Sequence, residues 1–161
     1  MDKLISIVMG SSSDLGTVGG VIDILKEFKV GFEVKVLSAH RTPKELVEYI
    51  EDASHKGKKV FIAAAGGSAA LAGVIAAHTT LPVIGIPIET KSLKGLDSLL
   101  ATVQMPAGVP VATMAIGKTG AKNSALFALE ILATSDKKIS SQLLKYKNRM
   151  RIKVKNSKIK L

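Results

Sequence analysis

Five short apolar runs alternate along the chain with segments of helical periodicity, and this alternation constrains the fold more than any other feature. The runs are apolar throughout, as in strands that are buried on both faces. Strands that alternate with helices form a parallel sheet covered by helices on both sides. Right-handed crossovers then give a doubly wound fold of the Rossmann-like or flavodoxin-like type.

The expected elements follow from this pattern. In the helix predicted over 43–57, Pro43 stands at the start and Gly57 near the end. Asp97 is expected to cap a short helix. The predicted strands are 3–9, 33–37, 60–64, 83–87 and 109–116, and the predicted helices are 21–28, 43–57, 68–79, 97–104 and 121–133.

The net charge of +10 belongs to the last part of the chain. Residues 1–136 contain 13 Lys or Arg and 13 Asp or Glu, whereas residues 137–161 contain 10 Lys or Arg and no acid. We therefore expect one catalytic α/β domain over 1–136 and a basic C-terminal helix or tail over 137–161. The neutral body argues against a nucleic-acid partner. The tail is expected to be a solvated extension, with an anion-binding arm as the alternative.

What the sequence lacks excludes several kinds of chemistry. There is no cysteine, so the chain has no disulfide, cysteine nucleophile or thiolate zinc site. No His and carboxylate spacing offers a metal site, so no metal is expected. The Gly117-Lys118-Thr119 run resembles the end of a P-loop, but Ala112 stands where its first glycine is required. The sequence also contains no GxGxxG motif, so a dinucleotide cofactor is not expected.

The hydrophobic runs also bear on location. The apolar run at residues 4–9 is too short for the core of a signal peptide. No apolar run reaches the length of about 18 residues that a membrane span needs. We therefore expect a cytoplasmic protein that has no membrane partner.

The predicted helix over 121–133 is apolar over most of its circumference. A single small sheet cannot bury all of such a helix, so we expect part of it to form a subunit interface. In a monomer, the C-terminal segment would have to shield it instead.

Ligands of a doubly wound sheet bind beyond the carboxyl ends of its strands, so the residues that follow the strands are candidate site residues. Ser11, Ser12 and Ser13 follow the first strand, where hydroxyls and backbone N–H groups at a helix start suit a phosphate. Asp14 ends this run and has the alternative role of a plain helix cap. Residues 65–68 follow the third strand.

The segment SAHRTP, residues 38–43, is the most informative. Arg41 offers a planar fork for an anion, and His40 can exchange protons near neutral pH. A lone histidine at a strand end is more often structural, but the adjacent arginine and the nearby serine loop favour a catalytic His40. His55 lies in a Lys-flanked stretch and is expected to be solvated, and His78 is expected to end a helix, where it suits the helix dipole.

Four motifs together resemble the class I N5-carboxyaminoimidazole ribonucleotide mutases of de novo purine biosynthesis, also called the catalytic subunit of phosphoribosylaminoimidazole carboxylase. They are MGSSSD, LSAHRTP, AAAGGSAALAGVIAAHT and GLDSLLATVQMPAGVPVATMAIGKTGAKNSALFALEIL. The resemblance covers about residues 3–145. It implies a flavodoxin-like three-layer α/β sandwich with a central parallel sheet, and a homo-octamer with active sites at subunit junctions. It also implies a small-molecule ribonucleotide substrate and no cofactor.

The resemblance further implies a reaction and a role for each site residue. The carboxylate moves from N5 to C4 of the ribonucleotide by decarboxylation and recarboxylation, with His40 as the proton shuttle. Ser11 and Arg41 bind the 5′-phosphate, and Asp14 holds the ribose hydroxyls. The residues expected to line the base and the CO2 pocket are Ser13, Ser38, Ala39, Gly66, Gly67 and Leu71.

One loop departs from the class I pattern. Class I loops usually read GGAAHLPG, whereas this chain has Ala70 for the His and Ala72 for the Pro, which is closer to the class II pattern GRSNALSG. Arg41 and Pro43 instead follow class I. A class II carboxylase that uses CO2 directly is therefore the alternative function. A non-enzymatic nucleotide- or nucleic-acid-binding protein is a remote one.

Overall fold

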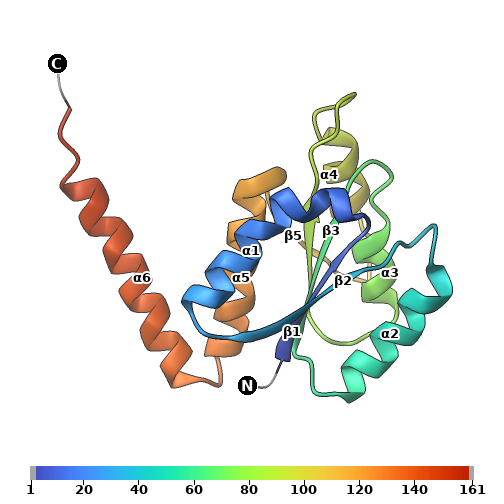
Figure 1. The fold of residues 1–161 in the computed structure, drawn as a ribbon, viewed down its shortest axis with the longest axis horizontal. Helices are drawn as coiled ribbons and strands as arrows, with labels where there is room; N and C mark the ends of the chain where they lie inside the picture. Colours follow the sequence, from blue (N-terminus) through green and yellow to red (C-terminus); the bar gives the residue numbers. More distant parts are fainter. Residues whose placement is uncertain (1–2, 160–161) are drawn as a thin grey trace. The chain divides into compact units, whose positions relative to one another are not determined.

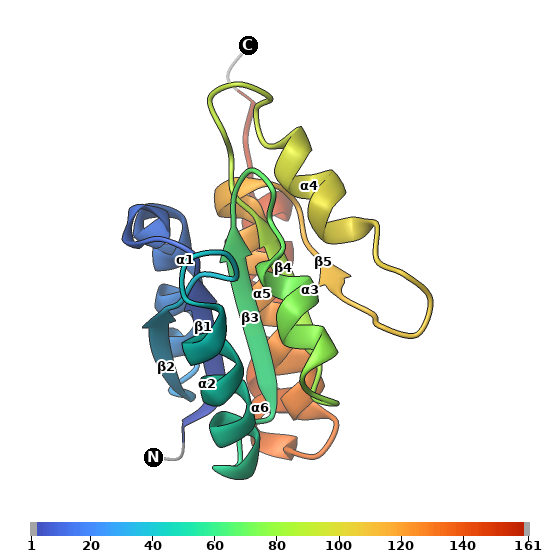
Figure 2. The same cartoon turned by 90° about the vertical axis from the view of Figure 1, so that its right-hand side faces the viewer.

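A computed structural model describes residues 3–159, which contain a five-stranded sheet with all strands parallel. The strand order β2-β1-β3-β4-β5 is that of flavodoxin-like folds, as expected. Figures 1 and 2 show α1 and the first part of α5 on one face of the sheet and α2 and α3 on the other. The elements are β1 (Lys3–Met9), a 3-10 turn (Ser12–Asp14), α1 (Leu15–Glu27), β2 (Gly31–Val36), α2 (Pro43–His55), β3 (Val60–Ala65), α3 (Leu71–Ala77), β4 (Val83–Pro87), α4 (Leu96–Val103), β5 (Ala112–Thr113), α5 (Gly117–Ala133) and α6 (Lys137–Lys155).

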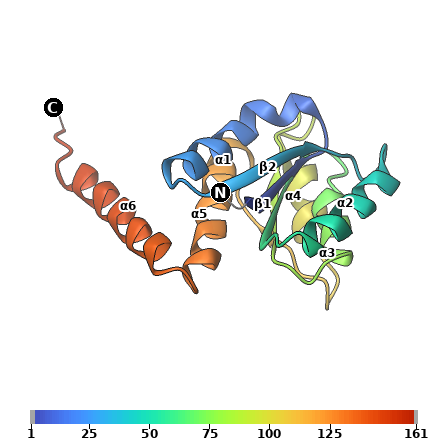
Figure 3. The ribbon, with the colours of Figure 1, turned by 60° about the horizontal axis from the view of Figure 1, so that its bottom comes forward.

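The core explains why the strands are apolar throughout. In the layer formed by α2 and α3, Leu46, Ile50 and Ile75 pack with Phe61 of β3, and all four are fully buried. Figure 3 shows these two helices side by side over the sheet. Full burial of such a side chain contributes about 1.5–3 kcal/mol. The helices therefore hold the sheet from both sides and leave its carboxyl edge open for a site.

The predicted strand over 109–116 is wrong in length, because β5 spans only Ala112–Thr113. Pro110 has no N–H to donate to a ladder, so it cannot continue the strand. Gly108 has a φ of +96°, which turns the chain out of an extended conformation. The strand therefore begins only after this Pro- and Gly-containing loop.

The predicted helix over 21–28 begins too late, because α1 starts at Leu15. Glycines at 16, 19 and 20 lower helix propensity, and this hid the first turns. In the structure, a Cβ on Gly20 would lie 3.7 Å from the Cβ of Ala121, so α5 packs directly over this stretch. Packing against α5 thus outweighs the low propensity of the glycines.

The helix α4 presents polar side chains to the sheet. Ser98 and Thr102, which lie one turn apart, are buried, and a Cβ on Gly85 of β4 would lie only 2.4 Å from Thr102 Cγ2. Glycine at position 85 therefore allows α4 to approach the sheet closely. The opposite side of the helix carries half-exposed apolar side chains: Leu96, Leu100 and Val103.

The start of α4 also corrects the predicted cap. Asp97 is not the N-cap, because Gly95 holds that position with a φ of +87°. The Asp97 carboxylate instead accepts a hydrogen bond from Thr90 Oγ1 at 2.8 Å. It therefore ties the helix to the chain segment that follows β4.

A polar network crosses the otherwise apolar interior beside β1. Lys58 is 6% exposed, and its ammonium donates to the Lys3 carbonyl at 2.8 Å and pairs with Glu33 Oε1 at 3.0 Å. The Tyr49 hydroxyl donates to the same Glu33 oxygen at 2.6 Å. Ser6 Oγ lies 2.6 Å from this hydroxyl, so Ser6 donates to Tyr49. The network joins β1, β2 and α2 with every group satisfied.

Glu33 should make the stability of the fold depend on pH. Burial alone would raise the pKa of its carboxyl, but hydrogen bonds from Tyr49 and Lys58 and the Lys58 charge together lower that pKa below its ordinary value. Such a carboxyl stabilises the fold above its unfolded-state pKa, and this contribution is lost as the pH falls through the folded-state pKa. Glu33→Gln is therefore expected to lower the free energy of unfolding at pH 7 by about 1–3 kcal/mol.

Urea unfolding at pH 7 and at several values between about pH 5 and pH 3 measures this effect. Wild type should lose stability over that range, and Glu33→Gln should lose less of it. The same change at the exposed Glu48 of α2 is the control, and this variant should keep the wild-type dependence of stability on pH. A Glu33→Gln protein with the full wild-type pH dependence would contradict the assignment.

Residues 129–161 form a second compact unit, which consists mainly of α6. The Asp136 carboxylate caps this helix by accepting hydrogen bonds from the N–H groups of Lys138 and Ile139. Ile139 and Leu143 are buried, whereas residues 147–159 are all exposed and include six of the basic side chains. None of the helices within residues 3–159 has the length and apolar character that crossing a bilayer requires.

Candidate active site

Three loops meet at the carboxyl edge of the sheet and enclose a cavity of about 360 Å³. They follow β1, β2 and β3, the three strands whose ends the sequence singled out. The size lies within the range of small-molecule sites. The residues that line the cavity are Gly10, Ser11, Asp14, Ser38, Ala39, His40, Arg41, Ala65, Gly66, Ser68, Ala69, Ala70 and Leu71.

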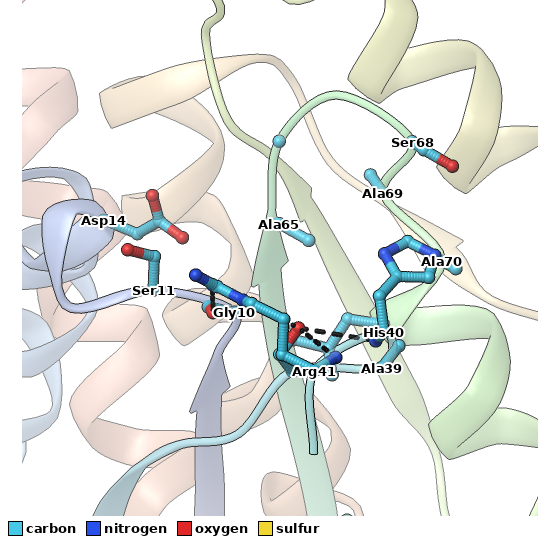
Figure 4. A pocket seen from close by; sticks show the side chains of 13 residues that line it. Gly10, Ser11, Asp14, Ala39, His40, Arg41, Ala65, Ser68, Ala69 and Ala70 are labelled. Atoms are coloured by element: carbon cyan, nitrogen blue, oxygen red, sulfur yellow. Dashed lines mark hydrogen bonds between the residues drawn. The ribbon is translucent and has the colours of Figure 1, made fainter. Parts of the chain in front are cut away.

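The first loop is a tight hydroxyl-rich turn. Ser11 Oγ caps the short 3-10 turn by accepting from the Ser13 N–H at 3.3 Å, and the Ser13 hydroxyl donates to it at 2.8 Å. Asp14 stands at the N-cap position of α1, but its carboxylate makes no capping hydrogen bond to the helix. The plain-cap interpretation of Asp14 is therefore wrong, and its carboxylate faces the cavity beside Ser11 (Figure 4).

The surroundings of Asp14 act on the pKa of its carboxyl in opposite directions. Partial burial raises the pKa of its carboxyl above the ordinary value, although hydrogen bonds from Ser13 and Ser11 and the charge of Arg41 act in the opposite direction. The Asp14 carboxylate therefore suits the neutral hydroxyl groups of a ligand as hydrogen-bond donors, whereas it would repel a negatively charged group such as a phosphate. The first loop thus offers the Ser11 hydroxyl and the Asp14 carboxylate to different parts of a ligand.

The second loop is organised around Ser38. Its Oγ accepts from the backbone N–H groups of His40 (3.4 Å) and Arg41 (3.2 Å). Thr42 Oγ1 closes the turn by accepting from the Ser38 N–H at 2.8 Å, and α2 starts at Pro43. These bonds hold His40 and Arg41 in a defined turn rather than on a loose loop.

Arg41 connects the second loop to the first. Its Nη2 donates to the Gly10 carbonyl at 2.6 Å, and its Nε donates to Ser38 Oγ at 3.4 Å. A guanidinium has five N–H donors, so three remain after these two bonds. The side chain is held at the cavity with donors left for an anion (Figure 4).

His40 lies exposed at the cavity, with its imidazole directed toward Ala70 of the third loop (Figure 4). Within residues 3–159, no hydrogen bond is made by its ring nitrogens. Both nitrogens are therefore available to a ligand. A side chain with one donor and one acceptor nitrogen at a cavity wall can deliver a proton to a bound molecule and take one back.

The third loop supplies a small-residue wall. Gly66 and Leu71 line the cavity as expected, whereas Gly67 and Ser13 do not lie on its surface. Gly67 has a φ of +69° and turns the chain toward α3. Five further residues line the cavity without a role assigned from the sequence, and only Ser68 among them carries a polar side chain: Gly10, Ala65, Ser68, Ala69 and Ala70. Ala65 and Ser68 belong to the segment 65–68, which the sequence had singled out by its position just beyond β3.

The other two histidines lie away from this cavity. His55 Nδ1 donates to the Glu51 carbonyl at the end of α2, and His78 follows the last turn of α3. Both are exposed, as expected for His55. Among residues 3–159, no group of three or more His, Asp or Glu side chains is arranged to hold a metal ion.

The comparisons with known proteins agree with the geometry. Residues 4–153 match the family model described as AIR carboxylase. The chain is similar to proteins named N5-carboxyaminoimidazole ribonucleotide mutase, with 54% identity to that of Bacillus subtilis (89% of this chain and 88% of the relative) and 50% to that of Escherichia coli (86% and 82%). The relative from Pyrococcus abyssi is 52% identical over 91% of this chain and 83% of its own.

Solved structures are also similar. The crystal structure of Treponema denticola PurE matches with a TM-score of 0.86 and 29% identity, over 94% of each chain. A variant PurE structure from the same organism matches with a TM-score of 0.87 and 29% identity over 100% of each chain. The resemblance of the whole fold therefore extends to experimentally determined structures.

Proposed function

The chain belongs to the AIR carboxylase family, and we propose that it is an N5-carboxyaminoimidazole ribonucleotide mutase that forms 4-carboxyaminoimidazole ribonucleotide. The observation that carries this proposal is that relatives about 50% identical over most of both chains are named for this activity. The cavity supports it, because it combines groups for an anion with one proton-transfer residue. We propose that the enzyme acts in the cytoplasm.

The proposed chemistry uses the three loops separately. Ser11 and the remaining donors of Arg41 bind the 5′-phosphate, and the Asp14 carboxylate accepts hydrogen bonds from the ribose hydroxyls. Ser13, Ser38 and Ala39, together with Gly66, Gly67 and Leu71, shape the base and CO2 side; Ser13 and Gly67 act there through the turns they form. These contacts place the reacting part of the substrate beside His40.

The reaction then needs one proton in each direction. As the bond between N5 and the carboxylate carbon breaks, its electron pair stays on N5, which takes a proton from His40, and CO2 is released. C4 of the imidazole attacks the trapped CO2, and the C4 proton passes to His40. The imidazole returns to its starting state, so one residue serves both transfers.

An assay with two substrates tests the function. Purified protein is given N5-carboxyaminoimidazole ribonucleotide or, separately, aminoimidazole ribonucleotide with bicarbonate, and formation of 4-carboxyaminoimidazole ribonucleotide is followed. We expect efficient turnover of the first substrate. Turnover only of the second would indicate the class II carboxylase, which the relatives do not favour. Turnover of neither substrate would contradict the proposal.

We further propose that the enzyme is a homo-octamer, and the outer side of α4 supports this. Leu96, Leu100 and Val103 repeat at helical spacing and are 47–51% exposed, and Leu93, just before the helix, is 57% exposed. Such a stripe on a folded surface favours a protein interface. In α5, the large apolar side chain left most exposed is Phe127, at 36%. The unpartnered face is thus more prominent on α4 than on the helix that the sequence suggested.

Introducing a charge into this stripe should break the assembly. Light scattering of wild type is expected to give about 135 kDa, eight times the 16.9 kDa of one chain. Leu100→Glu should give a smaller species, because an interface cannot bury an unpaired carboxylate cheaply. Ile152→Glu, at an equally exposed apolar position of α6, is the control and should remain octameric. A monomeric or dimeric wild type would refute the octamer.

The basic C-terminal segment is proposed to be dispensable for catalysis. All lining residues of the cavity precede position 72, and residues 147–159 are exposed. Deletion of residues 150–161, of which 160 and 161 lie outside the described part, should leave kcat within about twofold of wild type. A tenfold loss of kcat in a truncated protein that still forms octamers would overturn this and favour a functional anion-binding arm.

A further inference from the structure

Ser98 of α4 reaches the loop that follows β3, although 31 residues separate the two in sequence. Its side chain is fully buried, and its hydroxyl accepts a hydrogen bond from the Gly67 N–H at 2.9 Å. The same hydroxyl donates to the Ile88 carbonyl at 2.7 Å. Because a serine hydroxyl has one proton, its donation to Ile88 leaves the lone pairs for Gly67. The direction of the contact to the loop is therefore fixed.

Gly67 is the point at which this loop changes direction. Its φ of +69° belongs to the left-handed region, so the chain turns sharply between β3 and α3. Ser68, Ala69 and Ala70 come directly after it and line the cavity on the side toward which His40 points (Figure 4). A shift of the Gly67 peptide is therefore passed directly to the cavity wall.

The helix that carries Ser98 is held against the sheet by several contacts. Gly85 lets α4 lie closely against β4, as described above. Thr90 Oγ1 donates to the Asp97 carboxylate and accepts from the Gly95 N–H at 3.3 Å, which ties the start of the helix to the segment after β4. The position of the Ser98 hydroxyl is thus set by the contacts of α4 with β4 and the segment after it, and not by the loop that follows β3.

We propose that Ser98 is a positioning residue for the proposed reaction: it holds residues 66–71 in the shape that encloses the base and CO2, and does so through Gly67 without touching the substrate. The effect on turnover rests on the proposed function.

A matched pair of Ser→Ala variants tests the proposal. Ser98→Ala removes the support of Gly67, and we expect kcat to fall at least about tenfold, because small misplacements of reacting groups are costly. KM should change less than threefold, since the phosphate and ribose contacts come from the other two loops. Ser124→Ala is the control: Ser124 is equally buried and donates to the Ala121 carbonyl within its own helix at 2.7 Å. Its kcat should stay within twofold of wild type.

Hydrogen exchange of the Gly67 amide gives a readout that does not depend on activity. We expect exchange to be at least tenfold faster in Ser98→Ala and unchanged in Ser124→Ala. Unchanged exchange in Ser98→Ala, or equal losses of kcat in both variants, would overturn the proposal, and so would faster exchange with unchanged kcat. If wild type turns over neither substrate, the proposed function fails, whereas the exchange rate still decides whether Ser98 supports the loop. Should Ser98→Ala not fold, Ser98→Cys, which weakens the same contact, is judged by the same criteria.

Discussion

Replacing His40 with Asn is expected to lower kcat at least a hundredfold. The proposed reaction delivers a proton to N5 and later removes one from C4, and the imidazole is the proton-transfer group at the cavity wall. Asn is similar in size and can form hydrogen bonds, but it does not transfer protons near neutral pH. General acid–base catalysis contributes roughly 10²–10⁴-fold, or about 3–5 kcal/mol of barrier.

The measurement compares kcat, nucleotide binding and particle mass in the same preparations. His40→Asn should bind the nucleotide and assemble as wild type does, because the His40 ring makes no hydrogen bond within the described residues. His55→Asn removes an exposed histidine at the far end of α2 and should leave kcat unchanged. Turnover near the wild-type value in His40→Asn would remove the proton-shuttle role from this residue.

Arg41→Ala should act on binding. Loss of charged hydrogen bonds to a phosphate, each worth about 1.5–3 kcal/mol, predicts a KM that is roughly 10- to 100-fold higher. Part of the effect comes from the free protein, because the same side chain links the first two loops through the Gly10 carbonyl. Steady-state kinetics at saturating nucleotide should show a much smaller change in kcat than in KM.

Two further variants separate these contributions. Arg41→Lys keeps the positive charge but not the planar fork, and its KM is expected to lie between wild type and Arg41→Ala. Lys44→Ala removes an exposed charge three residues further on, outside the cavity lining, and should leave KM within about twofold. A KM unchanged in Arg41→Ala would show that the phosphate binds elsewhere.

The architecture could be predicted from the sequence because it depends on local patterns. The strand limits 3–9 and 83–87 agree with β1 and β4, where apolar runs end at Gly10 and at Pro87. Errors arose where packing overrides propensity, as at the glycines of α1, or where a proline shortens a strand, as at β5. These are tertiary or backbone effects that a hydropathy pattern does not contain.

The part of the site that lies at the strand ends could also be predicted from the sequence. His40, Arg41 and Ser11 were identified because strand ends in such folds gather at one edge, and the structure brings them to one cavity. Ser98 carried no such signal, since it lies inside a helix and its importance depends on a contact to a distant loop. Residues that support a site from a neighbouring element are therefore the ones that single-sequence reasoning misses.

The orientation of α4 has a consequence for how the active enzyme forms. A helix with hydroxyls against the sheet and leucines outside gains little from burial within one subunit, so in the proposed octamer much of its stabilisation comes from the neighbouring copy. Sheet formation and recovery of activity should then be separate events during refolding. Secondary structure should return at a rate independent of protein concentration. Activity should return by a later, second-order process that slows on dilution.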